Sequence, residues 1–450
     1  MAYPASDPFT KLPAELRLRV IMSTNCTTTI SQLIRASPSM LQQYLMDRRY
    51  IQRHIIDYDE DMMQDAMAII LIPHWPITSK EEPDEDIVKR ARAVLEDWSI
   101  GQLPHPTQHD HATSQLNELH NRILVLAEDY ITKATASFPP REYLCLPQIQ
   151  RPSANGHLMF KGVKVARRFD LADLTASEKK RVFKAFMRHE LMSRANSLFP
   201  WETRELHVPK RLVSKAESHG IICVRDYYCS LYGAMFAQCS DSQLPSSPTG
   251  TTLETDLKFP DTFHFDANTY AHELDLHDAT WREEFPDFAS WFSRLGIDRL
   301  TEFLRYDMGN EDDRDALFDH LQDTWFNGDK KYDFGLDVPW ASIFNESRSS
   351  HNACYDSNMF KQLSGSFKKF LQWDIARQRA WVFFDDTRLY PQETTERPNF
   401  PSSSFLQEKS IQTNSVHDWF NYPDFGRANR RSMLGYDERM RWKQLLNDRD

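Results

Sequence analysis

Glycine is scarce in this sequence, and its scarcity restricts the folds that the chain can adopt. Only 13 of the 450 residues are glycine, whereas 24 are proline. Phosphate-binding loops, β-bulges and the tightest hairpin turns use the positive φ angles that glycine adopts most easily. Proline instead ends helices and bounds loops. The composition therefore predicts a mainly α fold, in which helices are joined by proline-bounded loops.

Length and apolar content predict more than one packed domain. A chain of 450 residues exceeds the usual domain of about 100 to 200 residues, so we expect two or three domains. Hydrophobic residues make up 40% of the chain and aromatic residues 12%, which is typical of packed rather than disordered proteins. Six cysteines without a C-x-x-C pair indicate free thiols. With neither a secretory signal nor a long apolar run, a cytoplasmic or nuclear location is predicted.

Charge is distributed unevenly along the chain. The formal net charge is -11, and positions 254–337 hold 22 acidic and 8 basic residues. This acidic region argues against binding of nucleic acid by that part of the chain. A basic stretch, Lys179-Lys180-Arg181 with Lys184 and Arg188, has helical spacing. Because charge runs of this kind are usually solvated, we expect a solvent-facing helix surface rather than a phosphate-binding one.

The first 57 residues predict a small domain of three short helices. Pro13 has the place of a first helical residue, where its missing N–H costs nothing. Thr27 to Thr29 supply a cap for a second helix, and Ser37-Pro38 cap a third. Apolar residues recur at helical spacing after each cap, so residues 1–57 are expected to pack together.

The remaining sequence predicts a helical linker region at 58–137 and an aromatic-rich helical body at 138–450. The clearest helix runs from Thr175 to Phe199, because Thr175 and Glu178 have the spacing of a capping box. The stretch from Pro140 to Gly162 is expected to be irregular, and exposed loops are expected near 240–255 and 387–415. Further helices are expected at 59–72, 224–236, 287–306, 311–326, 355–385 and 430–446.

The N-terminal residues resemble an F-box. The resemblance lies in a Leu-Pro-x-Glu-Leu pattern, an aliphatic residue five positions later and an aliphatic second helix. The matching residues are Leu12, Pro13, Glu15, Leu16, Ile21, Leu33 and Ile34. The chain departs from the pattern at Met40-Leu41-Gln42, where a Cys or Ser followed by Trp is common. Segments 174–202 and 381–389 are also similar to fungal proteins that join an F-box-like domain to a long uncharacterised helical region.

The resemblance implies a non-catalytic substrate receptor. F-box proteins dock on a small adaptor subunit of cullin-RING ubiquitin ligases and hold a target protein with the rest of the chain. The residues that the resemblance assigns to adaptor binding are Leu12, Pro13, Leu16, Ile21 and Leu33. The alternative is that these residues only pack a helical cap, in a scaffold or interaction protein without ubiquitin-ligase association.

No motif with the spacing of a catalytic or metal site accompanies this resemblance. His272 and His277 are five residues apart, whereas the histidines of a zincin helix are four apart and share a face. Asp307 to Phe318 resembles an EF-hand loop in charge only, because the required Gly and Glu are missing. No phosphate-binding glycine motif occurs. We therefore predict no catalytic residue, metal or cofactor, and rank an unrecognised helical enzyme third among the hypotheses.

Overall fold

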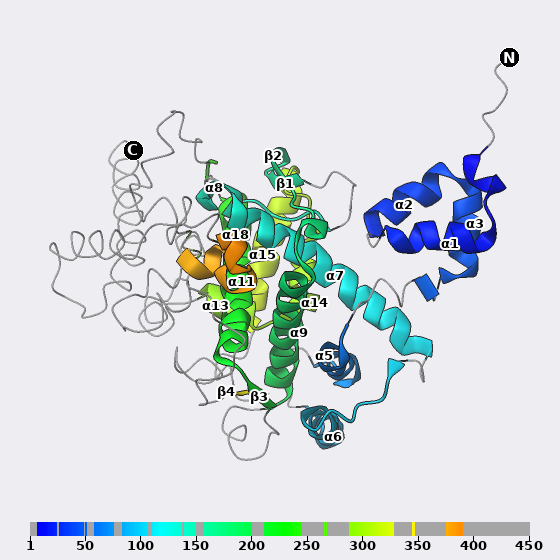
Figure 1. Cartoon of the computed structure of the whole chain (residues 1–450). Helices are drawn as coiled ribbons and strands as arrows, with labels where there is room; N and C mark the ends of the chain where they lie inside the picture. The colour runs from blue at the N-terminus through cyan, green and yellow to red at the C-terminus, as the bar shows by residue number, and fades with distance from the viewer. Residues whose placement is uncertain are drawn as a thin grey trace, which may run out of the picture.

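The computed structural model shows a mainly helical protein, as the composition predicts (Figure 1). It describes residues 7–24, 27–48, 50–51, 58–75, 83–106, 110–136, 139–149, 157–199, 211–240, 242–244, 265, 267, 288–327, 344–346 and 375–389. The helices are η1 (Pro8–Lys11), α1 (Ala14–Ser23), α2 (Thr27–Ala36), α3 (Pro38–Met46), α5 (Glu60–Leu71), α6 (Glu85–Ser99), α7 (Asp110–Thr135), α8 (Pro139–Tyr143), η3 (Leu171–Asp173), α9 (Ala176–Leu198), α11 (Lys215–Cys239), α13 (Phe288–Ser293), α14 (Gly296–Phe303), α15 (Glu311–Asn327), η8 (Trp381–Phe383) and α18 (Asp386–Leu389). The strands are β1 (His157–Phe160), β2 (Val163–Arg167), β3 (Arg211–Val213) and β4 (Phe344–Glu346).

Three short helices, α1, α2 and α3, form an N-terminal bundle with its own hydrophobic core. Ile21, Ile30, Met40 and Ile51 make up that core. Asp7, which precedes η1, is hydrogen-bonded to the start of α3. Its carboxylate accepts from Ser37 Oγ at 2.7 Å and from the Ser39 N–H at 3.1 Å. The three expected helices are therefore present, with Pro13 at the N-cap of α1.

A second hydrophobic core joins described helices from α5 to η8 into one body. Its buried residues extend along the chain from Met62 to Phe384 and include side chains of α5, α6 and α7. These three helices lie in the region expected to be a linker at 58–137. The division expected at residue 137 therefore does not separate two cores, because the helices on both sides of it bury their apolar faces together.

Helix α9 is the central element of the body, and it packs against α5, α7, α11 and α14 (Figure 1). Its N-terminus has the expected capping box: Thr175 accepts from the Glu178 N–H, and Glu178 accepts from the Thr175 N–H. Val182, Phe186 and Leu191 are fully buried. The capping box fixes where the helix begins, and packing on several sides fixes its place in the core.

One expectation about local structure was wrong, and one expected helix is present but longer than predicted. The stretch expected to be irregular as far as Gly162 contains β1, which pairs antiparallel with β2 through a turn at Lys161 and Gly162. Both turn residues have positive φ, as a tight hairpin requires, and a Cβ on Gly162 would lie 2.9 Å from the Gly309 Cα. The helix expected at 224–236 is the longer α11, because Ser214 and Glu217 form a second capping box.

The acidic segment confirms the helix expected at 311–326 as α15 and divides the one expected at 287–306 into α13 and α14. The break lies at Gly296, whose φ is 76° and whose Cβ, if present, would be 2.8 Å from Glu190 Oε2. The EF-hand-like charges of Glu311, Asp312 and Asp313 form the first turn of α15. Negative charge in the first turn interacts favourably with the helix dipole.

Segment 375–389 returns to the body and lies against α7, α8 and α9. Tyr130 Oη donates to the Arg377 carbonyl, and Arg388 Nε pairs with Glu178 Oε1 at 2.9 Å. Most of the helix expected at 355–385 lies outside the described residues, as do the helix at 430–446, the histidines of 272–277 and most of the loops near 240–255 and 387–415.

Candidate functional site

The residues that the F-box resemblance assigns to adaptor binding differ in their solvent exposure. Pro13 and Leu16 are exposed, with 44% of Leu16 accessible. Leu12 and Leu33 are half-buried, and Leu33 packs against the bundle core. Ile21 is fully buried, so it stabilises the bundle and has no surface to offer a partner.

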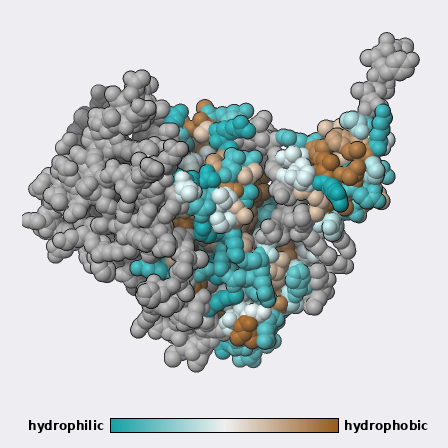
Figure 2. All heavy atoms as spheres, in the orientation of Figure 1, coloured by the Kyte–Doolittle hydropathy of each residue, from teal (hydrophilic) through white to brown (hydrophobic). Residues whose placement is uncertain are grey.

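Exposed apolar side chains are concentrated on this bundle. Among the described residues, the exposed large hydrophobic side chains are Leu16, Leu41, Leu45, Met46, Tyr50, Ile100, Val163 and Phe326. The first five belong to the bundle, and we call them the bundle face. Figure 2 shows a hydrophobic area on the bundle, whereas the described part of the body is mostly hydrophilic on the face in view. Leu41 and Leu45 are four residues apart on α3 and therefore lie on one side of that helix.

The basic stretch of α9 is solvent-facing only at its beginning, where Lys180 is 53% exposed, and it becomes paired and buried toward Arg188. Lys180 pairs with Asp59, Lys184 with Asp61, and Arg188 with Asp65 at 3.1 Å. These pairs recur at four-residue steps on α9 because such steps keep residues on one helix face. The face looks toward the beginning of α5, whose acidic residues neutralise it. We call these three pairs the ionic seam.

The inner end of the seam is deeply buried. Arg188 is 3% exposed and also pairs with Glu217 at 3.0 Å, while Asp65 is fully buried and accepts from Trp98 Nε1 at 2.8 Å. Burial raises the pKa of Asp65 although Arg188 opposes the rise. Burial would also raise the pKa of Glu217, but Arg188 and Lys184 hold it at about 2. The seam is thus a structural joint between α5, α9 and α11.

Glu190 of α9 has structural partners. It accepts from Arg194 Nε at 2.9 Å and from the Ile297 N–H at 2.7 Å. Asp385 likewise has a structural role. Its carboxylate accepts from Thr175 Oγ1 at 2.8 Å and pairs with Arg181.

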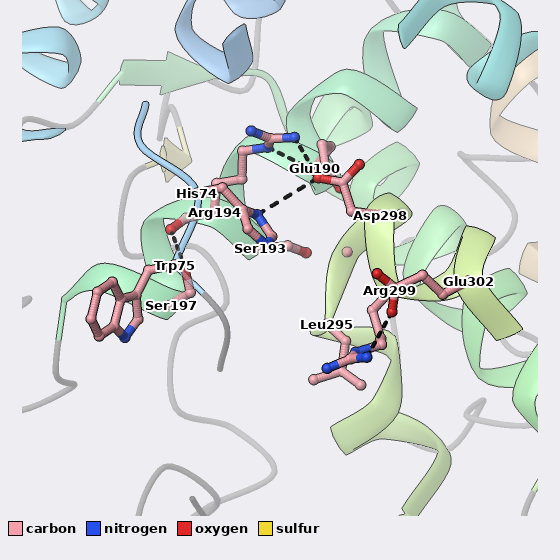
Figure 3. A pocket seen from close by; sticks show the side chains of 11 residues that line it. His74, Trp75, Glu190, Ser193, Arg194, Ser197, Leu295, Asp298, Arg299 and Glu302 are labelled. Carbon is pink, nitrogen blue, oxygen red and sulfur yellow. Dashed lines mark hydrogen bonds and ion pairs between the residues drawn. The ribbon is translucent and has the colours of Figure 1, made fainter. Parts of the chain in front are cut away.

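A pocket of about 140 Å³ lies where α9, α14 and the segment after α5 meet (Figure 3). Its lining residues are His74, Trp75, Glu190, Ser193, Arg194, Ser197, Leu295, Gly296, Asp298, Arg299 and Glu302. Figure 3 shows Trp75 beside Ser197 on one side of the pocket, and Leu295 near Arg299 on the other. Sequence reasoning did not find this pocket, because its residues come from three separated segments.

Charged side chains make up the buried wall of the pocket. Arg194 bridges two carboxylates, because its Nε pairs with Glu190 and its Nη2 pairs with Asp298 at 2.8 Å. Glu190 is 2% exposed, and burial raises its pKa despite the positive charge of Arg194. Burial also lowers the pKa of His74, which lies at the pocket mouth with 56% of its side chain exposed. The imidazole is therefore neutral at pH 7.

The described residues contain no group of three or more His, Cys, Asp or Glu side chains arranged to hold a metal ion. Within the same ranges, no helix combines the length and apolar character needed to cross a membrane. Cys145 and Cys223 are buried free thiols, and burial raises the pKa of Cys145 to about 12. A thiol with so high a pKa is a poor nucleophile at neutral pH.

Comparison with protein-family models, with curated proteins and with solved structures found no match to this chain. The bundle face, the ionic seam and the pocket are therefore interpreted from their own chemistry.

Proposed function

We propose that this chain is a non-catalytic, F-box-like substrate receptor. In this proposal the N-terminal bundle docks on the small adaptor subunit of a cullin-RING ubiquitin ligase, and the body binds a target protein. The proposal has its origin in the resemblance of residues 12–34 to an F-box. The structural observation that supports it best is the bundle face, because five of eight exposed large hydrophobic side chains in the described residues belong to one small bundle.

The size of the bundle makes an external partner physically reasonable. Its core consists of four buried apolar residues, and Leu16, Leu41 and Leu45 remain exposed outside that core. Large exposed apolar patches on soluble proteins commonly mark interaction sites. Covering a leucine fully contributes about 1.5 to 3 kcal/mol, so a partner seated on this face gains affinity from each leucine that it covers.

The ionic seam supports the second half of the proposal. A receptor needs a body that holds its target at a fixed distance from the adaptor. Helix α5 is the first described element after the bundle, and Asp61 and Asp65 fasten it to α9 through Lys184 and Arg188. Buried, multiply paired charges favour one arrangement of the helices they join, because any shift leaves a charge without its partner.

The test is adaptor binding by the purified chain and by a Leu12→Ala/Leu16→Ala variant, measured by calorimetry. Loss of both side chains is expected to weaken binding by about 3 kcal/mol, a factor of about a hundred. The matched control is Ile100→Ala/Val163→Ala, which removes exposed apolar side chains from the body and should bind like the wild type. Circular dichroism and thermal melting of each variant separate lost docking from lost folding.

The second candidate function is a scaffold or interaction protein without ubiquitin-ligase association. The bundle face also fits this function, because an apolar surface serves any stable partner. Wild-type protein that binds no adaptor but loses another partner when Leu12 and Leu16 are replaced would favour the scaffold. In that case the half-buried Leu12 and Leu33 and the buried Ile21 belong simply to a helical cap.

A further inference from the structure

The small pocket between α9 and α14 has the size of a site for one side chain. Its volume of about 140 Å³ is smaller than the roughly 300 to 1,000 Å³ that ligand sites usually occupy. The pocket has room for several water molecules. This space is too small for a nucleotide or a flavin, and it fits the end of a long amino-acid side chain.

Hydrogen-bond acceptors face this space. Ser193 Oγ donates its proton to the His189 carbonyl at 3.1 Å, and Ser197 Oγ donates to the Arg194 carbonyl at 2.8 Å. Both hydroxyls therefore turn only lone pairs to the pocket. Glu302 adds a carboxylate that is 46% exposed and uses Oε2 to pair with Arg299 at 2.6 Å. Its other oxygen keeps lone pairs for a ligand.

The positive charges of the pocket are already directed to its own carboxylates. Arg194 uses Nε for Glu190 and Nη2 for Asp298. Arg299 directs Nη1 to Glu302. Arg122 of α7 also pairs with Asp298, so the three carboxylates of the lining are balanced by three guanidinium groups, and the acceptor oxygens named above carry the argument for a cation. The indole of Trp75 supplies one wall, and an indole face attracts cations.

We propose that this pocket binds one basic side chain of the target protein. The cationic group donates to Glu302 and to the serine hydroxyl oxygens, while its stem lies along Trp75. An arginine is expected to bind more tightly than a lysine, because a planar guanidinium stacks on an aromatic ring and donates in two directions. This inference rests on the proposed function, since it names the feature by which the body recognises a target.

The probes are N-acetyl-arginine methylamide, its lysine counterpart and its citrulline counterpart, each titrated into the full chain and followed by calorimetry. Citrulline keeps the shape of arginine and lacks its charge. The arginine probe is expected to saturate the pocket with a Kd near about 1 mM, as suits a single side chain. Glu302→Gln and Trp75→Ala should each weaken it by about tenfold or more. The matched control is Glu85→Gln, because Glu85 is 82% exposed on α6 and does not line the pocket.

Saturable binding that favours arginine over citrulline and weakens in both pocket variants supports the proposal. No saturation up to about 20 mM, equal binding of citrulline, or equal loss in Glu85→Gln overturns it. Melting temperatures of the variants are measured beside the titrations. If one pocket variant fails to fold, the other still tests the pocket. Adaptor binding is assayed on the same samples. The bundle face and the pocket share no residue. The adaptor assay therefore tests the proposed function, and the arginine titration tests the pocket separately.

Discussion

The N-terminal bundle and the helical body differ in which side chains they bury. The bundle buries four apolar residues and leaves Leu45 and Met46 exposed by 60% and 74%. The body buries most of its large apolar residues and also draws charges inward, so that Arg188 and Asp65 lie almost out of contact with solvent. The bundle therefore presents apolar side chains to solvent, whereas the body buries both apolar side chains and an ion pair.

The largest expected effect comes from the apolar core of the body. Phe186 is fully buried on α9 and contacts Tyr227 with ring centroids 5.9 Å apart. Phe186→Ala is expected to lower the free energy of unfolding by about 3 to 5 kcal/mol, because it removes buried apolar surface and leaves a cavity. Denaturant titration measures this directly. A loss below about 1 kcal/mol would show that α9 is not the centre of the core.

Breaking the inner end of the ionic seam should cost nearly as much. Arg188→Met keeps the length of the side chain but leaves Asp65 in the interior without its nearest cation. Removal of one partner from a buried pair typically costs about 3 to 5 kcal/mol. Lys180→Met is the control, because Lys180 is 53% exposed and surface pairs contribute about 1 kcal/mol or less. Equal losses in the two variants would contradict the difference in burial that defines the seam.

The seam also predicts how stability depends on pH. Glu217 has an ordinary pKa of 4.5 and a folded pKa of about 2. A carboxyl with a lowered pKa stabilises the fold above its unfolded pKa, and this stabilisation is lost as the pH falls from 4.5 toward 2. The stability difference between wild type and Glu217→Gln should therefore shrink through that window. Urea titrations from pH 7 to pH 3 test this, and a constant difference would argue against the assigned charge pairs.

The raised pKa of the buried Asp65 acts in the opposite sense, since protonation at low pH relieves its burial. Comparison of wild type with Glu217→Gln at each pH removes that contribution, because both proteins contain Asp65.

The smallest effect is expected on the bundle face. Leu45 is 60% exposed on α3, so Leu45→Ser should change the free energy of unfolding by less than about 0.5 kcal/mol. Ile21→Ala should cost about 2 to 5 kcal/mol in the bundle, because Ile21 is fully buried. Thermal melting of the two variants separates the face from the core. A large loss in Leu45→Ser would mean that Leu45 packs within the protein.

Features set by neighbouring residues were predictable from the sequence. The capping box of Thr175 and Glu178 lies within four residues, and the cap of α3 at Ser37 lies directly before Pro38. Such contacts need no knowledge of the tertiary fold, because the backbone groups that they satisfy belong to the same turn. The mainly helical character follows from the same local signals.

Features made by distant residues were not predictable. Asp65 and Arg188 are 123 positions apart. The basic stretch was expected to face solvent, and no role was predicted for the acidic residues of α5 that pair with it. The pocket likewise depends on how Trp75, Arg194 and Glu302 meet after folding. A spacing of four between Asp298 and Glu302 placed both acids on one helix face, but no local pattern indicated what that face contacts.

The most direct test of the central claim is the affinity of the unmodified chain for the adaptor subunit. Calorimetry with the full-length protein should show one-to-one binding that is saturable at micromolar concentrations or below. Apolar association should also give a negative heat-capacity change between about 10 and 30 °C. An absence of binding at micromolar concentrations, in protein that circular dichroism shows to be folded, would contradict the receptor assignment of the bundle face.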